Sequence, residues 1–78
     1  MAKVKEETER AQILEALSNS NFRIKYVSDG ETGIAYLGGK MRVRRVRILV
    51  GDMVDVVVDP YGGKSRIVNR IIKRQNNN

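Results

Sequence analysis

The sequence predicts an all-β domain, a small five-stranded barrel, from three observations. Runs of alternating apolar and polar residues recur after position 20. Turn-forming dipeptides and glycine pairs separate these runs. The 78 residues suffice for one core only. Closing such a short sheet also removes the exposed strand edges that invite mispairing, so we expect a barrel rather than an open sheet.

The first ordered segment, residues 11–17 (AQILEAL), is ambiguous between helix and strand. Ile13, Leu14 and Leu17 fit a helical stripe, and the preceding Glu/Arg run favours a helix. Ile13 and Leu17 also alternate with polar Glu15, as in a strand. The local pattern alone favours a helix, whereas the expected five-stranded barrel counts this segment as its first strand. The charged residues 1–10 before it are predicted to form a flexible tail.

Residues 22–37 contain a hairpin signal. Phe22, Ile24 and Tyr26 alternate with two cations, which predicts a strand over 22–27 with one apolar face. Asp29-Gly30 follows, a dipeptide typical of tight hairpin turns because glycine readily adopts positive φ. The return strand is then predicted over 32–37.

The second half of the chain predicts a helical turn and two further strands. Gly38-Gly39 interrupts the pattern, and residues 40–47 are long enough for a short helical turn between the third and fourth strands. Residues 53–58 (MVDVVV) are dense in β-branched side chains and predict the fourth strand, with Asp55 outward. Residues 66–72 predict the last. We therefore expect one domain over 11–72 and a disordered tail over 73–78.

The charge is strongly basic and unevenly distributed. Fifteen Lys and Arg oppose nine Asp and Glu, for a net charge of +6 and a pI near 10.1. Residues 36–78 hold ten cations against three carboxylates, and five of these cations occupy one stretch of eight residues: Lys40, Arg42, Arg44, Arg45 and Arg47. An unmixed, arginine-rich cluster attracts polyanions, and the guanidinium fork suits phosphate oxygens. A nucleic acid is the favoured partner; an acidic protein, an anionic lipid surface or a merely solvated basic face are the alternatives.

Several classes of chemistry are not expected. The sequence has no Cys and no His, which removes thiolate nucleophiles, imidazole acid–base chemistry and the usual zinc sites. Gly63-Lys64-Ser65 imitates the end of a Walker loop, but Val58 stands where the first glycine is required. No apolar run approaches the roughly 20 residues of a membrane span. We expect a cytoplasmic binding protein without enzymatic activity, cofactor, metal or membrane contact.

Four aromatic side chains are present, and they divide into two pairs. Phe22 and Tyr26 share a face with Ile24, so core packing is expected for at least one of them. Tyr36 and Tyr61 are better placed for a surface role, in which rings beside cations stack on bases.

The order and spacing of several short runs resemble those of the bacterial translation initiation factor one family. The resemblance spans about residues 11–70. Its upstream runs are Leu14-Glu15-Ala16-Leu17 and Phe22-Arg23-Ile24. The downstream runs are Gly39-Lys40-Met41-Arg42, Arg47-Ile48-Leu49, Gly51-Asp52 before the valine-rich strand, Pro60-Tyr61 and Arg66-Ile67-Val68.

This resemblance implies an oligonucleotide/oligosaccharide-binding (OB) barrel of five strands with a short helical turn after strand three. Residues 11–17 would then be the first strand. It also implies a monomer that binds the small ribosomal subunit at the aminoacyl-tRNA site, through ribosomal RNA and a neighbouring ribosomal protein. There it would block premature tRNA entry and support the other initiation factors.

The same resemblance places RNA contacts in the basic turn. Lys40, Met41, Arg42 and Arg47 match the RNA-facing segment of the family. The full candidate RNA-binding set is Tyr36, Lys40, Met41, Arg42, Arg44, Arg45, Arg47, Tyr61, Lys64 and Arg66. Three of these depart from the family pattern: Tyr36 replaces a usual histidine, and Arg44 and Arg45 replace a polar residue and a tyrosine.

Two alternatives remain beside this hypothesis. A general single-stranded RNA-binding protein or RNA chaperone of cold-shock type shares the barrel and the charge, although four aromatic rings are few for that class. A protein-interaction barrel whose basic turn docks on an acidic partner is the other.

Overall fold

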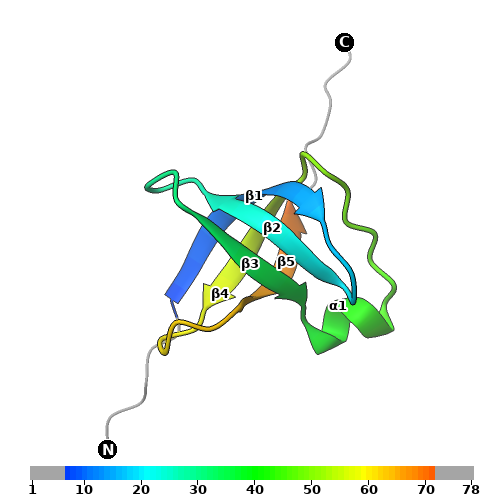
Figure 1. Ribbon diagram of the computed structural model, residues 1–78. Helices are drawn as coiled ribbons and strands as arrows, with labels where there is room; N and C mark the ends of the chain where they lie inside the picture. Colours follow the sequence, from blue (N-terminus) through cyan, green and yellow to red (C-terminus); the bar gives the residue numbers. More distant parts are fainter. Residues whose placement is uncertain (1–6, 72–78) are drawn as a thin grey trace, which may run out of the picture.

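A computed structural model describes residues 7–71 as a closed five-stranded barrel with one short helix (Figure 1). The strands are β1 (Glu7–Ala16), β2 (Asn21–Tyr26), β3 (Thr32–Leu37), β4 (Met53–Val58) and β5 (Ser65–Ile71), and the helix α1 (Gly39–Val43) lies between β3 and β4. The order around the barrel is β1-β2-β3-β5-β4, and β4 pairs with β1 to close it. All pairings are antiparallel except β3 with β5. The predicted all-β barrel with a helical turn between strands three and four is confirmed.

The local helix preference for residues 11–17 is wrong. These residues lie mostly in β1, where Ala11 pairs with Tyr26 of β2 and with Val54 of β4. Ile13 is fully buried. Pairing on both sides and burial of the alternating apolar side chains outweigh the weak helical propensity of the segment, because propensity differences amount to tenths of a kcal/mol per residue.

The first strand also begins earlier than the predicted domain boundary. Glu7 pairs with Val58 and Arg10 with Asp55, so residues 7–10 belong to the barrel and not to a tail. Pairing with β4 holds this charged run in the barrel, although its composition alone indicates no strand. The remaining residues of the predicted tails, 1–6 and 73–78, lie outside the described residues, as does residue 72, the predicted end of the last strand.

The barrel interior is filled by the inward side chains of every strand and by one residue of α1. The buried apolar residues are Ala11, Ile13, Phe22, Ile24, Ala35, Met41, Val54, Val56 and Ile67. Among residues 7–71, Ser65 is the one buried polar residue, and its Oγ lies 2.6 Å from the Tyr26 hydroxyl. As predicted, Phe22 and Ile24 face inward, and Tyr26 packs against the core.

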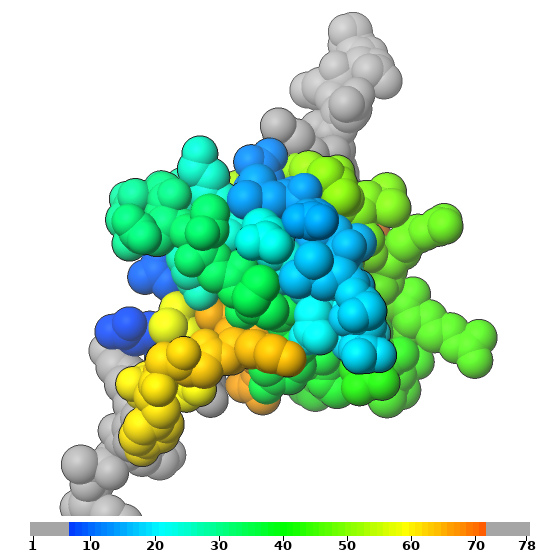
Figure 2. Space-filling model, viewed as in Figure 1, coloured from blue at the N-terminus to red at the C-terminus, as the bar shows by residue number. Residues whose placement is uncertain are grey.

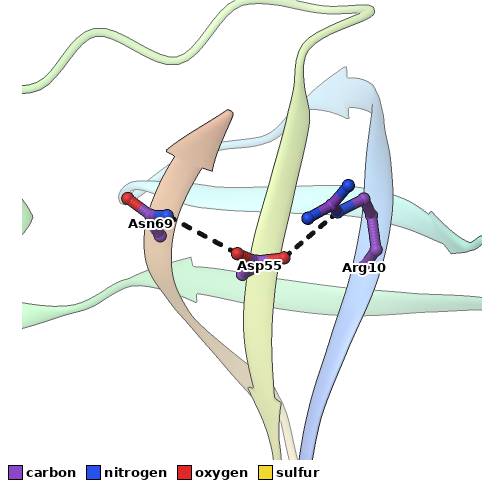
Figure 3. A network of polar contacts seen from close by, with 3 residues as sticks. All are labelled: Arg10, Asp55 and Asn69. Atoms are coloured by element: carbon purple, nitrogen blue, oxygen red, sulfur yellow. Dashed lines mark hydrogen bonds and ion pairs between the residues drawn. The ribbon is translucent and has the colours of Figure 1, made fainter. Parts of the chain in front are cut away.

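Polar side chains bridge three strands on the outer face of β1, β4 and β5 (Figure 3). Asp55 lies between Arg10, whose Nε is 3.2 Å from Oδ1, and Asn69, whose Nδ2 is 3.5 Å from Oδ2. The prediction that Asp55 points outward is confirmed. Exposed pairs of this kind each contribute at most about 1 kcal/mol to stability, so the core carries the fold.

Candidate RNA-binding surface

The basic segment, defined as residues 40–47, begins in α1 and is anchored to the barrel by Met41. The Met41 side chain is only 6% exposed and belongs to the core. Gly38 precedes the helix, and its carbonyl accepts hydrogen bonds from the N–H groups of Met41 and Arg42. The resemblance places Met41 among the RNA contacts, and in the structure its side chain faces inward as the only buried residue of the helix. Met41 therefore supports the basic segment from the barrel interior.

The helix ends in a hydrogen-bonding pattern that fixes the following residues. The N–H of Val46 donates to the Met41 carbonyl at 3.0 Å, and that of Arg45 to the Arg42 carbonyl at 3.1 Å. These two bonds define a Schellman motif, whose first residue after the cap adopts the left-handed conformation and is usually glycine. Here that residue is Arg45, with φ of 56°. An arginine therefore occupies a strained position at the centre of the basic segment.

Apolar and basic residues alternate after the helix. Val46 and Ile48 pack against the core, whereas Arg45 and Arg47 are exposed. Figure 2 shows the segment after α1 along one edge of the molecule, with side chains extending into solvent. The apolar anchors thus hold the segment on the barrel while its cations face outward.

The cations of this segment differ from the other arginines in their partners. Lys40, Arg42, Arg44, Arg45 and Arg47 are all exposed, and none forms an ion pair with a carboxylate in residues 7–71. Arg10, Arg23 and Arg70, by contrast, pair with Asp55, Glu15 and Asp52. Because no described carboxylate neutralises the segment, it raises the positive potential on its side of the barrel.

A groove of about 320 Å³ lies between α1 and β5 and extends the basic surface. Its lining includes Lys40 and Arg66, with Met41 and Ile67 as apolar lining. Tyr36 on β3 is the register partner of Arg66 on β5, and it is 38% exposed. Lys40, Tyr36 and Arg66, predicted from separate parts of the sequence, are therefore brought to one side of the barrel.

Tyr61 and Lys64 occupy the loop between β4 and β5. Tyr61 is 89% exposed, and Figure 1 shows this loop well separated from α1. Lys64 reaches back toward the sheet, where its Nζ lies 3.4 Å from Asn21 Oδ1. Since Asn21 is the register partner of Tyr36, Lys64 joins the edge of the basic surface and Tyr61 does not.

Asn21 was not predicted as a site residue. It pairs with Tyr36 across β2 and β3 and contacts Lys64, so it connects two predicted residues. Only the strand register reveals this connection. In the sequence, an asparagine after a turn indicates turn formation and not a binding site.

Metal clusters and membrane-spanning helices are both lacking in residues 7–71. No group of three or more His, Cys, Asp or Glu side chains in this range could hold a metal ion. No helix in the same range has the length and apolar character needed to cross a membrane.

The closed barrel and its exposed cations define a class: a small OB-fold protein with a nucleic-acid-binding surface. The family model for translation initiation factor 1A / IF-1 matches residues 1–78. Translation initiation factor IF-1 of Rickettsia akari (strain Hartford) is 46% identical over 59 residues, covering 74% of this chain and 82% of that protein. The chain therefore belongs to the translation initiation factor 1A / IF-1 family and is an RNA-binding factor of translation initiation.

Two solved structures share the barrel. The solution structure of translation initiation factor IF-1 from the Wolbachia endosymbiont strain TRS of Brugia malayi superposes with a TM-score of 0.71 at 26% identity, covering 88% of this chain and 82% of that one. The crystal structure of YjeQ from Thermotoga maritima gives a TM-score of 0.74 at 25% identity over 87% of this chain. This chain spans only 24% of YjeQ, so that comparison concerns the barrel alone.

Proposed function

We propose that this protein binds the small ribosomal subunit in the cytoplasm, as a monomer, at the aminoacyl-tRNA site. The principal contact is between the basic segment and ribosomal RNA, with a neighbouring ribosomal protein beside it. By occupying the site, the protein blocks premature tRNA entry and supports the other initiation factors. The action requires no turnover. The observation that carries the proposal is a row of exposed cations fixed on a rigid barrel.

Phosphate and 2′-hydroxyl contacts are the chemistry that such a surface favours. Guanidinium groups on a fixed scaffold recognise the shape of folded RNA and carry little sequence information. The Schellman motif and the apolar anchors order the segment before RNA arrives, so binding loses less conformational entropy. A fixed target of defined shape, such as a ribosomal site, suits this preorganised surface.

The cold-shock type of RNA binding fits the surface less well. That mode stacks successive bases on several exposed rings across adjacent strands. On β2 and β3, Phe22 is buried and Tyr26 is half-buried, which leaves Tyr36 as the exposed ring of these two strands.

The test is binding of Arg42→Ala and Arg47→Ala variants to isolated small subunits, combined with footprinting of the ribosomal RNA. Each substitution is expected to weaken binding by about 1–3 kcal/mol if the guanidinium makes a charge-assisted contact. The slope of log K against log salt should fall by roughly 0.7–0.9 for each phosphate that the variant no longer neutralises. Arg23→Ala is the control, because Arg23 lies on β2 and pairs with Glu15 at 3.0 Å.

Three results would contradict the proposal. Unchanged binding of the double variant would move the contact to another surface. Equal affinity for unstructured oligonucleotides and for small subunits would favour the RNA chaperone. Binding that persists after ribonuclease treatment of the partner fraction would favour a protein partner.

A further inference from the structure

Asp52 lies where the loop that contains the basic segment returns to the barrel. Its Oδ2 accepts a hydrogen bond from the Leu49 N–H at 2.9 Å, and its own N–H donates to the Leu49 carbonyl at 3.0 Å. The Asp52 carbonyl in turn accepts from the Ile13 N–H of β1 at 2.9 Å. One residue therefore closes the turn over 49–52 and attaches it to the first strand.

The same carboxylate faces Arg70 of β5. Asp52 Oδ2 lies 3.5 Å from Arg70 Nε, and this nitrogen is buried without a hydrogen-bond partner among the described residues. A nearby opposite charge compensates a guanidinium nitrogen that has no hydrogen-bond partner, and removing that charge leaves the nitrogen unpaired. Asp52 thus joins the loop, β1 and β5 through a single residue.

We propose that Asp52 is a positioning residue for the basic segment. Met41 fixes the start of the segment in the core, and the contacts of Asp52 fix the loop beyond its end. With both ends held, Val46 and Ile48 stay on the barrel and the cations keep one orientation toward RNA. This inference rests on the proposed function, because it concerns how the RNA-binding surface is kept in place.

The chain offers a matched control for this proposal in Asp59. Asp59 also closes a turn with its carboxylate, accepting from the N–H groups of Tyr61 at 3.1 Å and Gly63 at 2.9 Å. It belongs to the loop between β4 and β5, and Figure 1 shows this loop away from α1. Asp59→Ala therefore removes a similar turn without touching the basic segment.

The test compares Asp52→Ala, Asp52→Asn and Asp59→Ala at a temperature where circular dichroism shows each to be folded. The first measurement, without RNA, is amide hydrogen exchange of residues 44–46, whose N–H groups bond within the 40–46 stretch and not to Asp52. Asp52→Ala should speed this exchange about tenfold and weaken small-subunit binding about five- to tenfold. Asp52→Asn keeps an acceptor for Leu49 but lacks the charge, and should give an intermediate result. Asp59→Ala should leave the exchange of residues 44–46 unchanged.

The outcomes separate the two proposals. Unchanged exchange and affinity in both Asp52 variants, or equally fast exchange of residues 44–46 in Asp59→Ala, would overturn the positioning role. Weakened binding of Arg42→Ala beside an unaffected Asp52→Ala would overturn it while leaving the RNA contact intact. Faster exchange in Asp52→Ala, with Arg42→Ala binding normally, would support the role of Asp52 in holding the segment. It would overturn the proposed contact between the basic segment and ribosomal RNA.

Discussion

Replacing Arg45 by glycine should stabilise the protein while weakening its binding to RNA. Arg45 has φ of 56° at the position of the Schellman motif where helices usually place glycine. A side chain with a Cβ is strained there, because the Cβ approaches the following carbonyl oxygen. Glycine removes that strain, and it also removes one exposed cation from the basic segment.

The expected gain follows from two opposing terms. A left-handed residue with a Cβ is destabilised by roughly 1–2 kcal/mol relative to glycine in the folded state. Glycine in turn gives the unfolded chain more conformational entropy, which offsets about 0.4–1 kcal/mol. The net stabilisation of Arg45→Gly is therefore about 1 kcal/mol, which raises the Tm of a domain of this size by roughly 4–8 °C.

Arg44→Gly is the matched control. It removes the same charge one residue earlier, but Arg44 is the helix C-cap, with φ of −81° and ψ of −2°, a right-handed conformation that needs no glycine. Glycine relieves no strain there and only gives the unfolded chain more conformational entropy, so it should destabilise the protein by about 0.4–1 kcal/mol. Urea unfolding and small-subunit binding across a salt series would measure both effects. Destabilisation by Arg45→Gly would refute the strain argument, and unchanged binding would show that the Arg45 cation faces no phosphate.

Three further substitutions test the packing beneath the surface. Gly38→Ala should destabilise the protein by about 1–3 kcal/mol in urea unfolding, because the new Cβ would lie 2.8 Å from the Ile67 carbonyl oxygen. Tyr26→Phe should lower the free energy of unfolding by about 1–2 kcal/mol, since the buried Ser65 hydroxyl loses its 2.6 Å partner. Adding Ser65→Ala should recover part of this loss, and no recovery would argue against the hydrogen bond. Met41→Ala should lower the free energy of unfolding by about 2–5 kcal/mol and speed amide exchange in α1. Unchanged stability and unchanged exchange would show that Met41 does not anchor the helix.

The strands from β2 onward could be predicted from sequence because local and tertiary signals agree. Residues 32–37 and 53–58 coincide with β3 and β4 as predicted. The first strand could not be predicted from local pattern, because one of its two neighbours, β4, lies far along the chain, as the pairing of Glu7 with Val58 shows. Non-local pairing of this kind leaves no trace in a short window of sequence.

The candidate site likewise has features that the sequence predicts and features that only the structure shows. The position of the cations along the chain already indicated a surface for a polyanion, and the structure shows all five exposed. The conformation of Arg45, the inward turn of Met41 and the Asp52–Arg70 contact depend on backbone geometry that composition does not encode. Sequence therefore predicts which charges are available, and structure decides how they are held.

The way the segment is held links folding stability to RNA affinity. Met41, Val46 and Ile48 belong to the same packed interior as the strands, so the basic segment is part of the cooperative unit of the barrel. A substitution that loosens the core should then weaken RNA binding even where it touches no cation, because the exposed arginines would sample more orientations before contact. Arg45→Gly acts in the opposite direction, since it strengthens the scaffold and removes a charge. Stability and affinity should consequently fall together for core variants and separate for Arg45→Gly, a contrast that a basic segment independent of the barrel would not produce.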